Sequence, residues 1–320
     1  MRRRRCDSVT PDKPPAAAPI RGRKRRRQAG SRLGTGWSGP GSALQAVRGD
    51  GVACLAFAIA AALACAGHAA AAPRVLSLDQ CADQYVLALA PRGEIVGLSK
   101  RALNADSYER DRAQGLPERR ATLESALGAR PTVAVVYWTQ EARLPRALRR
   151  YGVTVVQIDD AHDFAGIRAN IRKVAAALGE PAAGAALIAR MDAELRQSQG
   201  AWGGARALYL TPYGFTGGAN TLVGAMMAAA GLVTASPAPG YAPVSLESLV
   251  LDPPSALVLG FFRDLAAGRQ RWTIAGNGYL KGLAARRAIA SLPGRVLGCP
   301  SWSAATGSLT LAQARQAPHH

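Results

Sequence analysis

The stretch from Asp163 to Gln199 is helical by pattern and holds no candidate strand, although it lies in a chain whose other segments alternate between strands and helices. Its apolar residues recur at helical spacing, and only GEPAAG at 179–184 interrupts them. We therefore expect a long helical connector, over 161–200, that separates two α/β halves. The apolar residues are Phe164, Ile167, Ile171, Val174, Leu178, Leu187, Ile188, Met191 and Leu195.

The first half, over 73–160, has the pattern of a sheet lobe with helices between its strands. RVLSL at 74–78 is a short apolar strand, and Asp79 directly after it can cap a helix with Tyr85, Val86 and Leu89 on its apolar face. A strand followed by a helix begins an α/β unit, which predicts a largely parallel sheet. Further strands are expected at 94–99, 133–138 and 153–158, and helices near 122–130 and 141–151.

The second half, over 201–320, repeats this scheme. The predicted fold class is α/β, with two Rossmann-like lobes joined by the connector and a ligand cleft between the lobes. The expected strands cover 205–210, 256–261 and 295–298, and the expected helices cover 221–230, 246–252, 279–291 and a closing segment to about 316.

An internal repeat supports the division into halves. TLESALGARPTVAVV at 122–136 and SLESLVLDPPSALVL at 245–259 align without a gap. Both share Leu-Glu-Ser, a Pro at the same offset and an apolar strand. The repeat predicts one helix, Pro break and strand in each half.

The N-terminal region has the pattern of an export signal. An apolar, uncharged run fills 52–67, Arg48 precedes it, and small residues follow it. We expect a signal peptide over 47–71, a mature chain that begins near Ala72, and a periplasmic location. Lipidation at Cys65 is the less favoured alternative, because Ala62 and Leu63 fit that processing site poorly.

Residues 1–46 are basic and cannot build a core. We favour a start codon placed too far upstream over a basic tail that contacts nucleic acid or membrane.

Charge and histidine content exclude several function classes. Residues 1–72 hold 13 of the 40 Lys and Arg residues, and the remaining body has 27 basic and 18 acidic residues, a net charge of +9 instead of +19. That charge is scattered, so nucleic-acid binding is poorly supported. His162 is the one internal histidine of the body, which argues against a zinc or manganese site. We expect no metal and no cofactor, and the chain lacks the nucleophile and base of an enzyme.

Two cysteines, Cys81 and Cys299, lie in the body. An even number in an oxidising compartment permits a bridge. Cys81 follows the first expected strand and Cys299 follows the last, which places them in different lobes. We therefore expect two unpaired, largely buried thiols.

The chain resembles the periplasmic binding proteins of importers for vitamin B12, ferric siderophores and heme. The resemblance covers about 74–316 and rests on RVLSLDQCADQ, TLESALGARP, VSLESLVLDPP, the GFTGGANTL loop at 214–222 and a late turn with Trp302. It implies a rigid helical connector, slight closure around a bulky ligand, and a monomer that delivers this ligand to the permease dimer of an ABC transporter.

Aromatic residues gather where strands end, which is where a two-lobed α/β protein binds its ligand. Ordinary packing of loops onto the lobe edge is the alternative for each of them. The resemblance adds Tyr241, at a position where the family has a cleft aromatic. The candidate aromatic ligand contacts are Tyr137, Trp138, Tyr213, Phe215, Phe261, Phe262, Trp302 and Tyr241.

Polar ligand contacts are expected at the same edge. The amides of Gly217 and Gly218 lead into a helix N-terminus suited to an anionic group, and a tight turn alone is the alternative interpretation of this pair. Arginines at the cleft mouth can add positive charge, and surface solvation is their default role. The candidates are Asp79, Gln80, Gln140, Arg143, Thr216, Arg119, Arg120 and Arg263.

Glu124 and Glu247 occupy equivalent positions of the repeat. The resemblance implies that these two docking carboxylates bind basic pockets of the paired permease subunits. The alternative is a solvated Glu that stabilises the first turn of its helix. A different class, an exported two-lobed hydrolase or transferase, is the rival function, and the sequence does not choose between siderophore, cobalamin and heme.

Overall fold

The computed structural model describes residues 72–137, 143–261 and 277–316. The predicted extension at 1–46 and signal peptide at 47–71 lie outside the described residues. No helix in the described ranges is long and apolar enough to cross a membrane.

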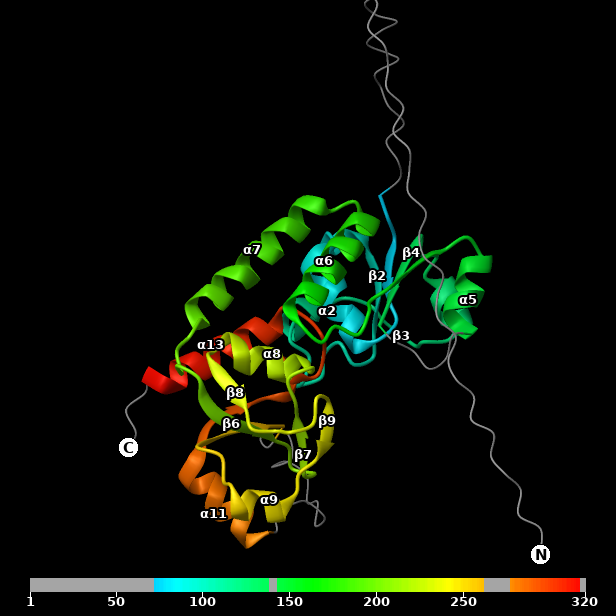
Figure 1. Ribbon diagram of the computed structural model, residues 1–320. Coiled ribbons are helices and arrows are strands. Elements are labelled where there is room, and N and C mark those ends of the chain that lie inside the picture. The colour runs from blue at the N-terminus through cyan, green and yellow to red at the C-terminus, as the bar shows by residue number, and fades with distance from the viewer. Residues whose placement is uncertain (1–71, 138–142, 262–276, 317–320) are drawn as a thin grey trace, which may run out of the picture. The chain divides into compact units, whose positions relative to one another are not determined.

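The first half forms a five-stranded parallel sheet in the order β3-β2-β1-β4-β5 (Figure 1). Helices connect consecutive strands, as the sequence pattern predicts. Its elements are β1 (Val75–Ser77), α2 (Gln80–Leu89), η1 (Arg92–Glu94), β2 (Ile95–Ser99), α3 (Arg110–Ala113), β3 (Glu118–Arg119), α4 (Leu123–Gly128), β4 (Val133–Val136), α5 (Arg143–Arg150) and β5 (Thr154–Gln157).

The central strands of this sheet are buried on both faces. Successive side chains of a strand point to opposite faces, so Val133 and Val135 of β4 pack into one apolar cluster while Ala134 and Val136 pack into another. The first cluster includes α2, and the second includes Ala126 of α4 and Leu148 of α5. Burial on both faces explains why β4 reads as an uninterrupted apolar run.

The connector consists of two helices, α6 (Phe164–Leu178) and α7 (Pro181–Ser198). Gly179 ends α6 in the left-handed conformation, with φ of 75°, and Pro181 begins α7. The helices pack closely, because a Cβ atom on Gly184 would lie 2.6 Å from Cβ of Ala175. A short break between two packed helices therefore interrupts the connector.

The second half contains a four-stranded parallel sheet in the order β11-β10-β6-β8 and a separate antiparallel pair, β7 and β9. Its elements are β6 (Ala205–Leu210), β7 (Phe215–Gly217), α8 (Leu222–Ala229), β8 (Leu232–Thr234), β9 (Tyr241–Pro243), α9 (Leu246–Leu251), β10 (Ala256–Gly260), α11 (Gly278–Arg287), β11 (Ala288–Leu292), α12 (Gly294–Leu297) and α13 (Ser303–Gln316).

The predicted strand at 295–298 is wrong. That segment is helix α12, which begins after Pro293, and the strand is β11, whose first four residues fall in the range expected to be helical. Helix α11 ends at Arg287 because the chain then pairs with β10 in parallel, from Ala288 to Leu292. Tertiary pairing overrides the weak strand propensity of AIASL.

The C-terminal segment returns to the first half. Helix α13 (red in Figure 1) packs along α7 of the connector. Just before it, the Tyr85 hydroxyl donates to Pro300 O at 2.6 Å, and the Trp302 ring meets the Tyr85 ring edge to face, with centroids 5.2 Å apart. One apolar cluster accordingly includes residues from both sheets, the connector and α13.

This return overturns the prediction of two free thiols, because Cys81 and Cys299 form a disulfide with a Cα–Cα distance of 5.3 Å. The prediction failed because it assigned Cys299 to the lobe of its preceding strand. The segment that carries Cys299 instead crosses to the N-terminal turn of α2, where Cys81 lies.

We expect this disulfide to stabilise the fold strongly, because it closes a loop with a sequence separation of 218 residues. Replacing Cys81 and Cys299 together by Ser should lower the free energy of unfolding by about 2–5 kcal/mol, mainly through the entropy of the unfolded chain. Urea unfolding measures the change. Reductant should destabilise the wild type and leave the double variant unaffected; a wild-type midpoint indifferent to reductant would contradict the expectation.

Candidate functional site

Asp79 joins three segments at the carboxyl end of the first sheet. Its Oδ1 accepts from the amides of Cys81 and Ala82 at 3.0 and 2.9 Å, which caps α2. Its Oδ2 accepts from the amide of Tyr137 at 2.7 Å, directly after β4. Burial raises the pKa of Asp79, and these backbone hydrogen bonds oppose the rise. The predicted helix cap is confirmed. The same carboxylate also holds the backbone amide of Tyr137, and so the position from which its side chain extends.

Tyr137 connects this point to the end of β5. Its hydroxyl donates to Oδ1 of Asp160 at 2.8 Å. Burial raises the pKa of Tyr137, and its hydrogen bond to Asp160 and the charges of Asp160 and Asp79 raise it further. The phenol therefore stays neutral. Because β1, β4 and β5 are adjacent, residues following their ends meet at one edge.

Tyr241 is the residue of the second half that interacts with Tyr137 and Asp160. It begins β9 and lies opposite Gly217 of β7. Desolvation at its hydroxyl, and then the charge of Asp160, raise the pKa of Tyr241, although the residue as a whole is largely exposed. Tyr241 in turn raises the pKa of Tyr137. Tyr241 therefore interacts electrostatically with both first-half residues. We call Asp79, Tyr137, Asp160 and Tyr241 the inter-lobe cluster.

The second half exposes aromatic rings on strands β7 and β9 and just before β7. Tyr213 is 52% exposed, Phe215 45% and Tyr241 63%. Phe215 and Gly217 point to the same side of β7, because they are two residues apart, and Gly217 faces Tyr241 across the pair. Phe215 and Tyr241 thus share one face. Large exposed rings gathered near polar groups are typical of a binding surface.

The other predicted contacts differ in their burial. Trp302 is 7% exposed and packs in the core against Tyr85, while Gln80 is buried in the first turn of α2. Thr216 is 4% exposed and lines a cavity inside the second half. Arg120 and Arg143 are exposed, and Arg119 is half-buried. The predicted contacts Trp138, Gln140, Phe262 and Arg263 lie outside the described residues.

Gly218 lies where two backbone segments approach closely. The Gly218 amide donates to Gly240 O at 3.0 Å, so it does not point toward an anionic ligand. A Cβ atom at Gly218 would lie 1.7 Å from the carbonyl oxygen of Ala238, which explains why the position needs glycine. Thr221 caps the following helix α8 by accepting from the Gly224 amide.

The repeated segments form the same local structure in both halves. Thr122 caps α4 and Ser245 caps α9, each by accepting from the amide three residues ahead. Glu124 and Glu247 lie in the first turns and are exposed. The exposed apolar residues that accompany Glu247 on α9 were not predicted: Leu246, Val250 and Leu251 are 41, 58 and 78% exposed.

Sequence reasoning also missed two carboxylates. Asp160 follows a strand end just as the predicted aromatics do, so the same rule could have found it. Asp83 is fully buried in α2 and accepts from the amide and hydroxyl of Ser99 at 2.8 and 2.5 Å. Burial raises the pKa of Asp83 to about 6. Within the described residues, no group of three His, Cys, Asp or Glu could hold a metal ion.

The chain is similar to known proteins in sequence and in fold. Residues 75–260 match a family described as periplasmic binding proteins. No curated protein matches the chain.

Solved structures share the fold. The periplasmic heme-binding protein BhuT, in complex with two hemes, is 23% identical, with a TM-score of 0.60 over 76% of this chain and 99% of that chain. The periplasmic heme-binding protein HutB of Vibrio cholerae is 17% identical, with a TM-score of 0.62 over 76% of this chain and 98% of that chain. The periplasmic vitamin B12 binding protein BtuF of Vibrio cholerae is 16% identical, with a TM-score of 0.54 over 76% of this chain and 96% of that chain. Such low identities show the fold alone, which confirms the predicted two-lobed α/β class.

We expect Asp83 to make stability depend on pH. Its pKa is higher in the folded state, so the folded state binds the proton more tightly, and stability is lost as pH rises from about 4 to about 6. A shift of about two units corresponds to about 3 kcal/mol. Asp83→Asn should remove this contribution to the difference in unfolding free energy between pH 4 and pH 7.

Chemical denaturation at both pH values tests this expectation. Asp111→Asn, whose side chain is 89% exposed, is the matched control and should behave as the wild type. Parallel pH profiles for the wild type and Asp83→Asn would contradict the assigned role.

Proposed function

The chain belongs to the periplasmic binding protein family, and on that premise we propose that it captures a bulky ligand and delivers it to an ABC importer. The proposed ligand class comprises ferric siderophores, cobalamin and heme. The observation that carries the proposal is the inter-lobe cluster, in which Asp79 and Asp160 hold Tyr137 and the exposed Tyr241 of the second half interacts electrostatically with Asp160.

The chemistry of this cluster suits a large, partly apolar ligand with polar edges. Tyr241, Phe215 and Tyr213 offer exposed rings for stacking. Tyr137 is held by Asp79 at its amide and by Asp160 at its hydroxyl, so its position is set before a ligand arrives. A pre-organised site loses less conformational entropy on binding. Relatives of the same fold bind heme and vitamin B12, which supports this ligand class.

We propose export through the signal peptide at 47–71, a monomeric mature protein, and docking of Glu124 and Glu247 onto the two permease subunits. One exposed carboxylate per half, each on an equivalent short helix, suits a two-fold partner. The exposed apolar residues on α9 add contact area beside Glu247. The rival function, an exported hydrolase or transferase, has no support from the family or the structural relatives.

Titration with heme, cyanocobalamin and a ferric siderophore, followed by tryptophan fluorescence quenching, tests the ligand class. We expect one of them to saturate the protein, and Tyr241→Ala to weaken its binding about fivefold or more through lost ring contact. Tyr151→Ala is the matched control, because Tyr151 is 65% exposed and follows α5. Saturation by none of the three ligands would overturn the proposed class, and equal affinity in both variants would remove Tyr241 from the site.

Replacing Glu124 and Glu247 together by Ala should abolish most uptake while ligand affinity stays unchanged. Stability should fall only slightly, because exposed first-turn carboxylates contribute about 0.3–1 kcal/mol to their helices. Uptake in the native host and thermal melting of the purified protein measure the two effects. Asp111→Ala with Glu118→Ala removes the same charge from exposed positions and should leave uptake intact. Full transport by the Glu124 and Glu247 double variant would disprove docking through these residues.

A further inference from the structure

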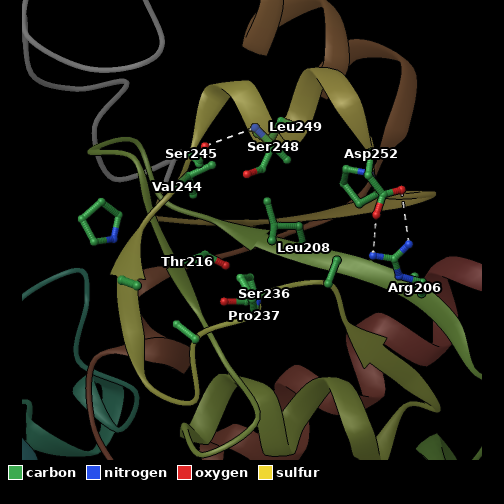
Figure 2. Close-up of a pocket in the computed structure, with 15 residues that line it drawn as sticks. Arg206, Leu208, Thr216, Ser236, Pro237, Val244, Ser245, Ser248, Leu249 and Asp252 are labelled. Atoms are coloured by element: carbon green, nitrogen blue, oxygen red, sulfur yellow. Dashed lines mark hydrogen bonds and ion pairs between the residues drawn. The ribbon is translucent and has the colours of Figure 1, made fainter.

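The second half contains a cavity of about 340 Å³ that the proposed function does not use. It lies between β6, the β7–β9 pair, the loop at 235–238 and helix α9, and Figure 2 shows the side chains that surround it. Its walls include Arg206, Leu208, Thr216, Ser236, Val244 and Leu249.

The β7–β9 pair separates this cavity from the inter-lobe cluster. Thr216 lies opposite Ala242 in the pair, and both line the cavity. Gly217 lies opposite Tyr241, and neither of these lines it. Because neighbouring residues of a strand point to opposite faces, Thr216 and Ala242 point away from the face that carries Tyr241. Pro243, two residues from Tyr241, also lines the cavity, so the cavity extends around the end of β9.

Two hydroxyl groups of the cavity wall have no hydrogen-bond partner among the described residues, namely those of Thr216 and Ser236. Thr216 is 4% exposed, and its backbone pairs within the sheet while its side chain does not. The Ser236 amide is satisfied by the Thr234 hydroxyl at 3.2 Å, which again leaves the side chain unpaired. Buried polar groups in native proteins normally have partners, so a molecule that bonds to these two hydroxyls would satisfy them.

The charge of the wall is balanced. Arg206 binds Asp252 through two contacts of 3.4 and 3.0 Å at the edge of the cavity (Figure 2). Most other lining side chains are aliphatic, proline or hydroxyl-bearing. Such a wall neither attracts an ion nor solvates one, and it suits an uncharged molecule.

We propose that this cavity is a second ligand site, which takes a small uncharged molecule with an apolar body and one or two hydroxyl or carbonyl groups. Its volume is at the lower end for small-molecule pockets, which span about 300–1,000 Å³. A cobalamin, siderophore or heme is too large for it, so the two sites select different chemistry. The occupant lies against Leu249, the one buried residue of α9.

Fluorine NMR with 4-fluorobenzyl alcohol and 4-fluorotoluene tests the site. The alcohol should bind saturably, and the toluene should bind roughly two- to tenfold more weakly, because it cannot pair with the hydroxyls. Thr216→Val keeps the side-chain volume and removes one hydroxyl; combined with Ser236→Ala, it should make the two probes bind equally.

Two further variants locate the binding. Ala242→Leu fills the cavity and should abolish probe binding, whereas Tyr241→Ala, on the other face of the same pair, should leave it unchanged. Binding of the fluorinated probes does not require the bulky ligand. A failure of the second-site proposal can therefore be told apart from a failure of the proposed import function. Probe binding that is absent, or insensitive to both Ala242→Leu and the hydroxyl variants, would overturn the second site; ordered water alone on the two hydroxyls in a structure soaked with the alcohol would do the same.

Discussion

The Asp79 carboxylate is the interaction on which the candidate site depends. One oxygen caps α2 and the other holds the amide after β4, so a single side chain joins two strand ends to a helix. A carboxylate can satisfy several donors at once, which a hydroxyl cap cannot do as well. The Tyr137 ring is thereby directed toward Asp160, and the first-half part of the inter-lobe cluster follows from local hydrogen bonds alone.

The second-half part depends on how the halves are held together. Side chains of both sheets, the connector and α13 share one apolar cluster, and the Cys81–Cys299 disulfide adds a covalent link to the N-terminal turn of α2. The same turn begins at Asp79, two residues from Cys81. The covalent link and the site are therefore adjacent, which restrains the part of the first half that Tyr241 must meet. Restraint of this kind favours a site formed before the ligand binds.

Local sequence signals predicted the fold class, the α2 cap, the strands with strong apolar runs and the repeated helices with Glu124 and Glu247. The errors have a common cause, because each depends on contacts between distant residues. β11 exists through pairing with β10, the disulfide joins residues 218 apart, and Trp302 enters the core because its segment returns to Tyr85. Strands β7 and β9 have three residues each, too few for alternation to be recognised in a single sequence.

Alternation along these short strands nonetheless determines what each residue can do. Phe215 and Thr216 are neighbours, and both follow the end of β6, so the rule that ligands bind at strand ends selected both. Their side chains leave the pair in opposite directions: Phe215 is exposed on the face of Tyr241, and Thr216 enters the cavity beneath α9. Position at a strand end thus identifies the region of a site, whereas the direction of each side chain decides which of two compartments it serves. A three-residue strand between two compartments can contribute to both without any change in the fold.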